Sequence, residues 1–500
     1  MKILVIYDNE NFGPEIEYVF NLFFSILGPE YKILPLSRLG GEDEEDTPLL
    51  ISYSKAAIGT RVPRQIHIGS SDFFGENYLK PESLPVLPLK KAQDLPIIFS
   101  GGELSSAGAP LSGGGVVVSN NLIETNIDII AGSFFMLARY EEFLPGLRDS
   151  FGRFPMSSSL AFRAGFSSRP IVNEYLELFW QWIGSFNLDI KRKNLWPENK
   201  HFAAALTHDI DAVRKHGFGK TLKRAAGLAL KRGDFKGAIA ELKEFSRLIF
   251  KAKENDPFWS FERIAGLEKK QGVVSSFFFL ALRKGKEYSV NDTDVSSLIG
   301  GLERGGFEVG LHGSFSSADN YEIMRSEKEN LDATVDNRPY GSRQHALRWS
   351  AGVWQTQSLL GLLYDSSVGF VEDAGFRAGF CLPYKPFDLI GRTAINIWEL
   401  PLIIMDTAVL RADNRGLAPQ ECLELIFNYI QTVKKHHGVL TILWHNYAFP
   451  PLDIPSHYHR WREMYEKTLQ ELNKEGALTG SGRDIINWWI AANKTYETDI

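Results

Sequence analysis

Two aspartates that stand one residue apart, Asp209 and Asp211, are the first residues whose spacing suggests chemistry. They follow the apolar run 202–206, which is typical of a buried strand. Residues two apart in an extended chain point to the same side, so both carboxylates can face one pocket while His208 faces away. A cation with a general base beside it needs such a pair. The alternative is a cap for the following helix with a surface salt bridge.

Polar side chains also follow three later apolar runs. Parallel β/α barrels carry their chemistry at the carboxyl ends of successive strands, so these side chains would lie near the two aspartates. A single histidine at a strand end is more often structural, but Asp, His, Arg and His at four strand ends favour an active site. The three later residues are His312 after 307–311, Arg348 after 344–347 and His445 after 439–444.

The alternation of apolar runs and helical stretches predicts an α/β protein of two domains. Residues 1–195 would form an N-terminal α/β domain, whose function the sequence does not indicate. The boundary falls in 194–200, where Pro197 argues against a continuing helix. Residues 200–500 then repeat strands and helices with the rhythm of a barrel.

Five short motifs, taken in order, resemble the polysaccharide deacetylase (NodB-like) family of carbohydrate esterases over about residues 200 to 500. The Asp-x-Asp variant is similar to peptidoglycan deacetylase and allantoinase-like members, which also carry a Glu-x-Pro strand, here 398–401. With Arg-Tyr-Glu-Glu at 139–142, the whole chain also looks like a bacterial two-domain group. The resemblance implies a distorted barrel of about seven β/α units. The motifs are Thr-His-Asp-Ile-Asp (207–211), His-Gly-Ser-Phe-Ser (312–316), Leu-Arg-Trp (347–349), Tyr-Asp-Ser-Ser (364–367) and Leu-Trp-His-Asn (443–446).

The resemblance also implies roles for single residues. Asp209 would be the general base and Asp211 a metal ligand, with His312 as a second ligand. His445 would protonate the leaving amine, because the pKa of a histidine can lie near neutrality. Arg348 would pair with Asp209 and fix its orientation, although a purely structural ion pair is an equal alternative for it.

The chain departs from the family at the third ligand. The family motif is His-x-x-x-His, and its fifth position is Ser316 here. A neutral hydroxyl is a poor ligand for zinc, so Ser316 is a weak candidate. His345 could supply the missing imidazole, but a regular strand would place His345 and Arg348 on opposite faces, and a bulge would be needed to bring both to the site. Zn²⁺ is the expected metal by resemblance, with Co²⁺ or Ni²⁺ possible.

Further residues are candidates for a supporting role around the site or for contact with substrate. Two of them, Asp365 and Asp406, stand where family members have acidic positions, and each could instead cap a turn. The full set is His208, Asp365, Asp406, Glu399 and Trp444.

Composition limits the partners. The net charge of −6 gives no overall attraction for nucleic acid, and two cysteines cannot form a disulfide framework. The N-terminus lacks a signal-like apolar stretch and no run is long enough to span a membrane, so a cytoplasmic protein is expected. The segment 220–253 carries ten Lys or Arg against three acids and is amphipathic. It could lie on an anionic membrane surface, or form a solvated helix pair packed on the barrel.

The sequence therefore predicts a metal-dependent hydrolase of amide C–N bonds. Its substrate would be a carbohydrate, most simply the N-acetyl group of an amino sugar in a surface polysaccharide or its precursor. Two alternatives remain open. The first is a noncatalytic carbohydrate-binding or assembly protein with a degenerate metal site, and the second is an allantoinase-like amidohydrolase that acts on a small ureide.

Overall fold

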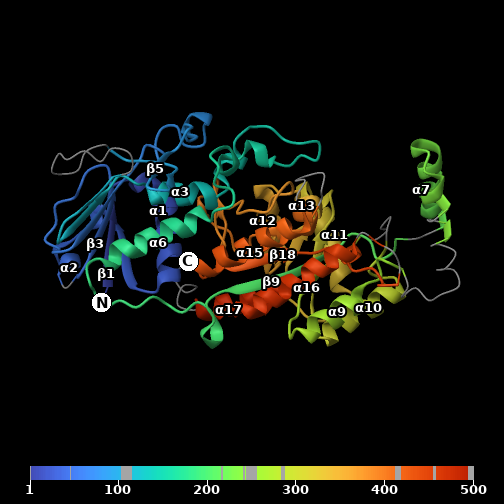
Figure 1. Ribbon diagram of the computed structural model, residues 1–500. Coiled ribbons are helices and arrows are strands. Elements are labelled where there is room, and N and C mark those ends of the chain that lie inside the picture. The colour runs from blue at the N-terminus through green and yellow to red at the C-terminus, as the bar shows by residue number, and fades with distance from the viewer. Residues whose placement is uncertain are drawn as a thin grey trace.

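The computed structural model contains two large β-sheets, each with helices packed against it (Figure 1). The first sheet is formed by residues 2–125 and the second by residues 203–480. The structure describes residues 2–45, 47–102, 115–215, 218–239, 242–243, 256–282, 288–410, 418–453, 456 and 458–493.

The first sheet has the order β2-β1-β3-β4-β8-β7. All its pairs are parallel except β7 with β8. Figure 1 shows helices α1, α3 and α6 on the side of this sheet that faces the second sheet. The strands are β1 (Lys2–Tyr7), β2 (Glu30–Pro35), β3 (Leu50–Ser54), β4 (Gln65–Gly69), β7 (Val116–Val118) and β8 (Leu122–Thr125), with a separate hairpin β5 (Lys90–Ala92) and β6 (Leu95–Ile97). The helices are α1 (Gly13–Leu27), α2 (Gly41–Glu44), α3 (Ile129–Leu137), α4 (Tyr140–Phe143), α5 (Leu160–Arg163) and α6 (Ile171–Gly184).

The second sheet is a parallel half-barrel, which is consistent with the distorted barrel that the sequence predicts. Its order is β16-β13-β12-β11-β10-β9-β18-β17, and β19 also pairs with β9. Among the described strands, β16 and β17 stand at the two ends of this order and do not pair with each other. The strands are β9 (Ala203–Ile210), β10 (Ser276–Leu280), β11 (Glu308–Gly313), β12 (Ser342–Gln344), β13 (Tyr364–Asp365), β16 (Trp398–Glu399), β17 (Ile404–Met405), β18 (Val439–Leu443) and β19 (Leu478–Gly480). A small antiparallel pair, β14 (Phe387–Asp388) and β15 (Thr393–Ala394), lies outside it.

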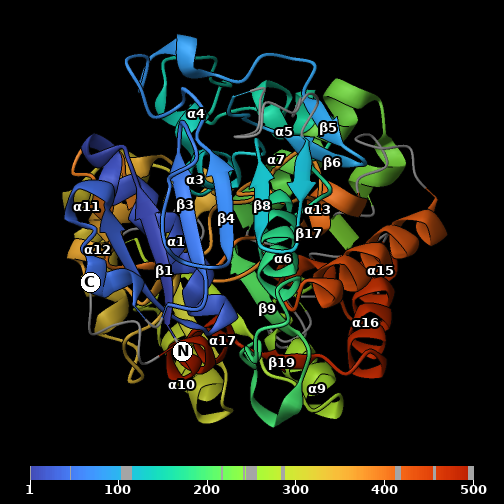
Figure 2. The same cartoon turned by 90° about the vertical axis from the view of Figure 1, so that its left-hand side faces the viewer.

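Helices other than α7 pack around the half-barrel (Figure 2). Each of these long helices buries one apolar face, as the alternation of polar and apolar residues requires. The helices are α7 (Phe218–Arg232), α9 (Phe261–Lys270), α10 (Thr293–Arg304), α11 (Tyr321–Asp332), α12 (Ala351–Leu359), α13 (Asp406–Leu410), α15 (Pro419–Lys435), α16 (His459–Lys474) and α17 (Gly482–Ala492). Among the residues described, none of the helices combines the length and apolar character needed to cross a membrane.

A buried group of charges joins the two parts of the chain. Glu142 lies between the guanidinium groups of Arg139 and Arg377, and Arg139 also donates to the backbone carbonyl of Arg377. Burial alone would raise the pKa of Glu142, but the two cations outweigh it and lower this pKa to about 2. One continuous apolar cluster also includes residues from both sheets. A division into domains at 195–200 stays a prediction.

Candidate metal centre and active site

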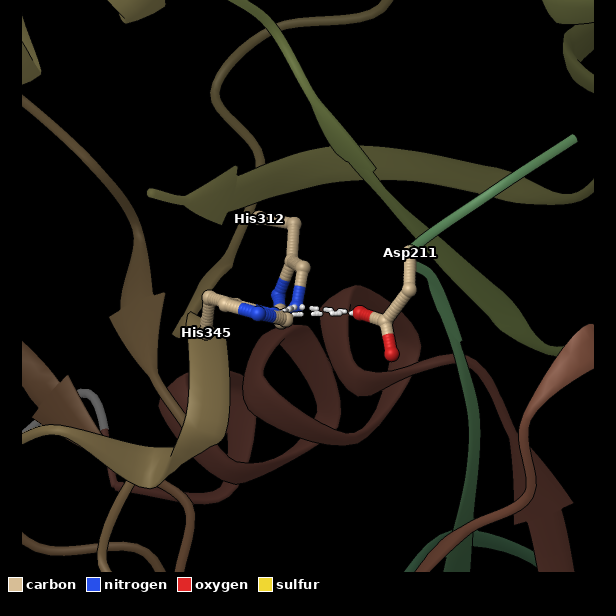
Figure 3. A group of neighbouring side chains, drawn as sticks. All are labelled: Asp211, His312 and His345. Atoms are coloured by element: carbon tan, nitrogen blue, oxygen red, sulfur yellow. Dashed lines mark hydrogen bonds and ion pairs between the residues drawn. The ribbon is translucent and has the colours of Figure 1, made fainter. Parts of the chain in front are cut away.

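Three side chains from the ends of three strands meet at one point (Figure 3). Asp211 follows β9, His312 lies in β11, and His345 follows β12. The Asp211 Oδ1 atom lies 3.2 Å from His312 Nε2 and 3.1 Å from His345 Nδ1. The two imidazole nitrogens are 3.1 Å apart. One carboxylate oxygen and two imidazole nitrogens at this separation form a possible ligand set for a divalent cation.

The hydrogen bonds around this group fit a cation. His312 Nδ1 lies 3.0 Å from the Arg343 carbonyl oxygen and donates to it, which leaves the lone pair of Nε2 directed at the other two residues. Asp211 Oδ1 is buried and has no hydrogen bond of good geometry, although two ring nitrogens lie close to it. Burial opposes ionisation of Asp211, but the two histidines outweigh it and hold its pKa well below the usual range. Two nitrogens and one charged oxygen suit Zn²⁺, and also Co²⁺ or Ni²⁺.

His345 reaches the site because the strand ends early. The sequence predicts a strand to residue 347, but β12 ends at Gln344 and a 3-10 turn begins at His345. Within this turn, Ala346 and Leu347 adopt left-handed backbone angles, with φ of 60° and 50°. Such angles are unfavourable for residues with side chains, so contacts from outside must hold the turn. One of these comes from the N-terminal part of the chain, where Arg153 donates to the Ala346 carbonyl oxygen at 3.0 Å.

Ser316, the weak candidate for a ligand, lies apart from the buried residues of the site. Its side chain is exposed, and the residue precedes the 3-10 turn Ser317–Asp319 on the rim. The His345 imidazole, 3.1 Å from Asp211 Oδ1, is a better ligand for a divalent cation than an exposed hydroxyl.

The expected pairing of Arg348 with Asp209 is wrong in this structure, because Arg343 takes that place. Arg343 is buried, and its NH1 donates to Asp209 Oδ1 at 3.0 Å and to Thr207 Oγ1 at 2.7 Å. Its other nitrogens donate to the backbone and side chain of Ser366. Because the chain leaves the strand at His345, Arg348 instead lies at the rim and pairs with Asp319. Arg343 stands two residues before His345, so period-two alternation could have found it.

Replacement of these two arginines by glutamine is expected to have very different effects. Arg343→Gln breaks a buried ion pair and should lower the free energy of unfolding by about 3–5 kcal/mol. Arg348→Gln removes a pair at the rim and should cost about 1 kcal/mol or less. Urea unfolding followed by tryptophan fluorescence measures both. Equal losses for the two variants would contradict the assignment of Arg343 as the partner of Asp209.

His445 follows β18, lies beside the same three residues and is held by Asp406. Its Nδ1 lies 2.7 Å from Asp406 Oδ1, and its backbone N–H donates to Oδ2 at 2.8 Å. The His445 Nε2 atom is 3.8 Å from Asp211 Oδ2. Burial would lower the pKa of His445, but the Asp406 carboxylate outweighs it and raises this pKa to about 9. The imidazole is therefore protonated at neutral pH and can donate a proton.

The other supporting candidates are buried and contact groups of the protein itself. His208 faces away from the aspartates, 2.9 Å from Glu268 and 2.6 Å from the Trp444 carbonyl oxygen. Asp365 and Glu399 are buried carboxyls whose pKa values are raised by burial. Through Ser367, which bonds to both Asp365 and the backbone of Gln344, they support the end of β12.

An aromatic wall stands beside His445. The ring of Tyr447 is stacked on His445, with centroids 4.9 Å apart and an interplanar angle of 18°. Tyr458 and Trp461 continue the wall at 5.2 Å and 6.4 Å from Tyr447. All three aromatic residues are half-buried, so their rings can offer a face to a ligand. The adjacency of Tyr447 to His445 is the only sequence signal that could have identified it.

A family of unknown function (DUF7033) matches residues 4–187, and the search of curated proteins found no match. Among solved structures, a protein of Mycobacterium smegmatis provisionally named a polysaccharide deacetylase is similar at 18% identity, over 60% of this chain and 93% of that one, with a TM-score of 0.40.

Two further solved structures resemble the chain. A carbohydrate deacetylase covers 98% of this chain and 87% of its own at 9% identity, with a TM-score of 0.34. A CE4 family pseudoenzyme of Bacillus anthracis covers 57% of this chain and 65% of its own at 11% identity, with a TM-score of 0.30. Similarity at this level says nothing about catalysis, so the chemistry has to be derived from the side chains of this chain.

Proposed function

We propose that the half-barrel hydrolyses an amide C–N bond, namely the N-acetyl group of an amino sugar in a surface polysaccharide or its precursor. The observation that carries the proposal is the different surroundings of two carboxylates in one pocket. Asp211 contacts two imidazoles, whereas Asp209 contacts a guanidinium group. A metal ligand and a general base need these two environments.

The residues then divide the reaction between them. A divalent cation held by Asp211, His312 and His345 would polarise the acetamide carbonyl and make a water molecule more acidic. Asp209, oriented by Arg343, takes the proton of the attacking water. His445 gives its proton to the leaving nitrogen, so that the amine departs as a neutral group. The wall formed by Tyr447, Tyr458 and Trp461 binds the sugar ring through its apolar face.

Release of acetate from N-acetylglucosamine oligomers by the purified, zinc-loaded protein tests the proposal. Acetate release that is lost on removal of the metal supports it. Turnover of a ureide such as allantoin without acetate release would favour the allantoinase-like alternative. A protein that binds the oligomers but takes up no metal would favour the noncatalytic one. A cytoplasmic location and a bacterial source stay predictions from the sequence.

The pH dependence of kcat/KM should show the effect of Asp406 on the pKa of His445. Because Asp406 raises the pKa of His445, the protonated acid persists up to about pH 9 and is lost above it. Asp406→Asn removes that attraction, so the alkaline limb of kcat/KM should move to lower pH by a unit or more. Rate profiles between pH 5 and 10 measure the shift. An unchanged alkaline limb in the variant would exclude His445 as the group that titrates there.

A further inference from the structure

Helix α7 and the residues after it stand apart from the half-barrel as an arm (Figure 1). We define the arm as the described residues 218–239 and 242–243. Large apolar side chains are exposed along it, most of all Leu230 at 84% and Phe235 at 65% exposure. The exposed apolar residues of the arm are Leu222, Leu230, Phe235, Ile239 and Leu242.

The residues that the arm buries are small. Ala225 and Ala238 are 5% and 7% exposed, on α7 and on the segment that follows it. A solvated helix pair would bury its leucines and phenylalanine and expose its alanines. Burial of a large apolar side chain stabilises the fold more than burial of a methyl group does. The arm instead buries Ala225 and Ala238 and exposes Leu230 and Phe235, although Ala226 is exposed and Leu228 is half-buried. Five large apolar residues are thus exposed within 21 positions, which is typical of a segment that binds a partner or a membrane.

The charge of the arm indicates which partner its exposed apolar residues bind. Residues 218–243 contain seven Lys or Arg and two Asp or Glu, although the whole chain has a net charge of −6. A second copy of the arm would carry the same positive charge and repel the first. A nucleic acid would match the charge but offer little to exposed leucines. A bilayer of anionic phospholipids satisfies both features, since its headgroups attract cations and its acyl boundary accepts apolar side chains.

We propose that the arm binds to the surface of an anionic phospholipid bilayer, with Leu230 and Phe235 inserted at the acyl boundary. The chain enters the arm seven residues after Asp211, and seven extended residues span about 25 Å. Asp211 therefore lies within this distance of the first residue of the arm. The interaction does not depend on the proposed hydrolysis, so it holds whether or not the protein is a deacetylase.

Co-sedimentation of the full chain with vesicles tests the proposal. Vesicles of phosphatidylcholine with 30% phosphatidylglycerol should bind the protein at 0.1 M NaCl, and pure phosphatidylcholine should bind it at least tenfold more weakly. Raising NaCl to 0.5 M should weaken binding to the anionic vesicles, because salt screens the attraction. No binding to the anionic vesicles, or equal binding to both compositions, would overturn the proposal.

Matched variants distinguish binding through the arm from nonspecific binding through exposed apolar residues elsewhere. The double change Leu230→Glu with Phe235→Glu should reduce binding to anionic vesicles at least tenfold, and Lys236→Glu alone about fivefold or more. The control Ile390→Glu alters an equally exposed apolar residue outside the arm, 68% exposed, and should bind as the original does. Circular dichroism checks that each variant is folded. If the double variant keeps full binding, or instead dissociates a dimer seen by light scattering, the bilayer is not the partner.

Discussion

Replacement of Asp211 by alanine is expected to give a folded protein that no longer holds a divalent cation. Asp211 supplies the only negative charge of the ligand set, and its Oδ1 atom is the point at which both imidazoles converge. Without it, two neutral nitrogens remain, and the affinity for Zn²⁺ should fall more than about a hundredfold. Calorimetric titration of the metal-free protein with Zn²⁺ measures this change directly and needs no substrate.

A second pair of variants tests the third ligand in the same experiment. His345→Ala should weaken Zn²⁺ binding in the same direction as Asp211→Ala, whereas Ser316→Ala should leave it unchanged, because Ser316 is exposed and outside the ligand group. The opposite order, with Ser316 needed and His345 dispensable, would restore the family motif and refute the site described here.

The change Asp209→Asn is expected to abolish turnover while zinc is still bound. Asparagine keeps the shape of aspartate but cannot accept a proton, and loss of a general base typically costs a factor of about 10²–10⁴ in rate. Asp209 is not part of the ligand set. Its Oδ2 atom lies 3.9 Å from His312 Nε2. Acetate release and zinc stoichiometry, measured on one preparation, give both answers.

Asp209→Asn also removes the ion pair with Arg343, and a measurement of stability serves as the control for this loss. Arg343 stays buried without a charged partner, so some loss of stability is expected. Urea unfolding of Asp209→Asn shows whether the protein is folded at the assay temperature. A folded variant with normal turnover would remove Asp209 from the mechanism, and a folded variant without zinc would make it a ligand.

The sequence predicted the faces of strand β9 well, and for a simple reason. Period-two alternation in an extended chain is a local property, so His208 on one side and the two aspartates on the other follow from the spacing alone. The structure places His208 against Glu268 and both aspartates beside His312.

The surroundings of His345 were harder to predict because they depend on distant residues. Two left-handed residues end the regular strand, and neither Ala346 nor Leu347 is a residue type that signals such a conformation. The hydrogen bond from Arg153 that supports the turn comes from 193 positions earlier in the chain. The same turn carries Arg348 to the rim, which is why the buried partner of Asp209 was assigned to the wrong arginine.

The role of Asp406 and the extent of the barrel were also hard to predict from the sequence. Asp406 had been predicted only as a supporting residue, and its contact with His445 joins the amino end of α13 to the end of β18. The strands β13, β16 and β17 have only two residues each, too few for periodicity to define, so the sequence alone could not show where the half-barrel ends.

Anomalous diffraction from a crystal grown with Zn²⁺ tests the third ligand most directly. We expect one strong peak at the zinc edge, within bonding distance of an Asp211 oxygen, His312 Nε2 and His345 Nδ1, with Ser316 remote from it. A map without a peak at this position under saturating zinc, or a zinc ion bound while His345 points elsewhere, would contradict the site and the hydrolysis proposed from it.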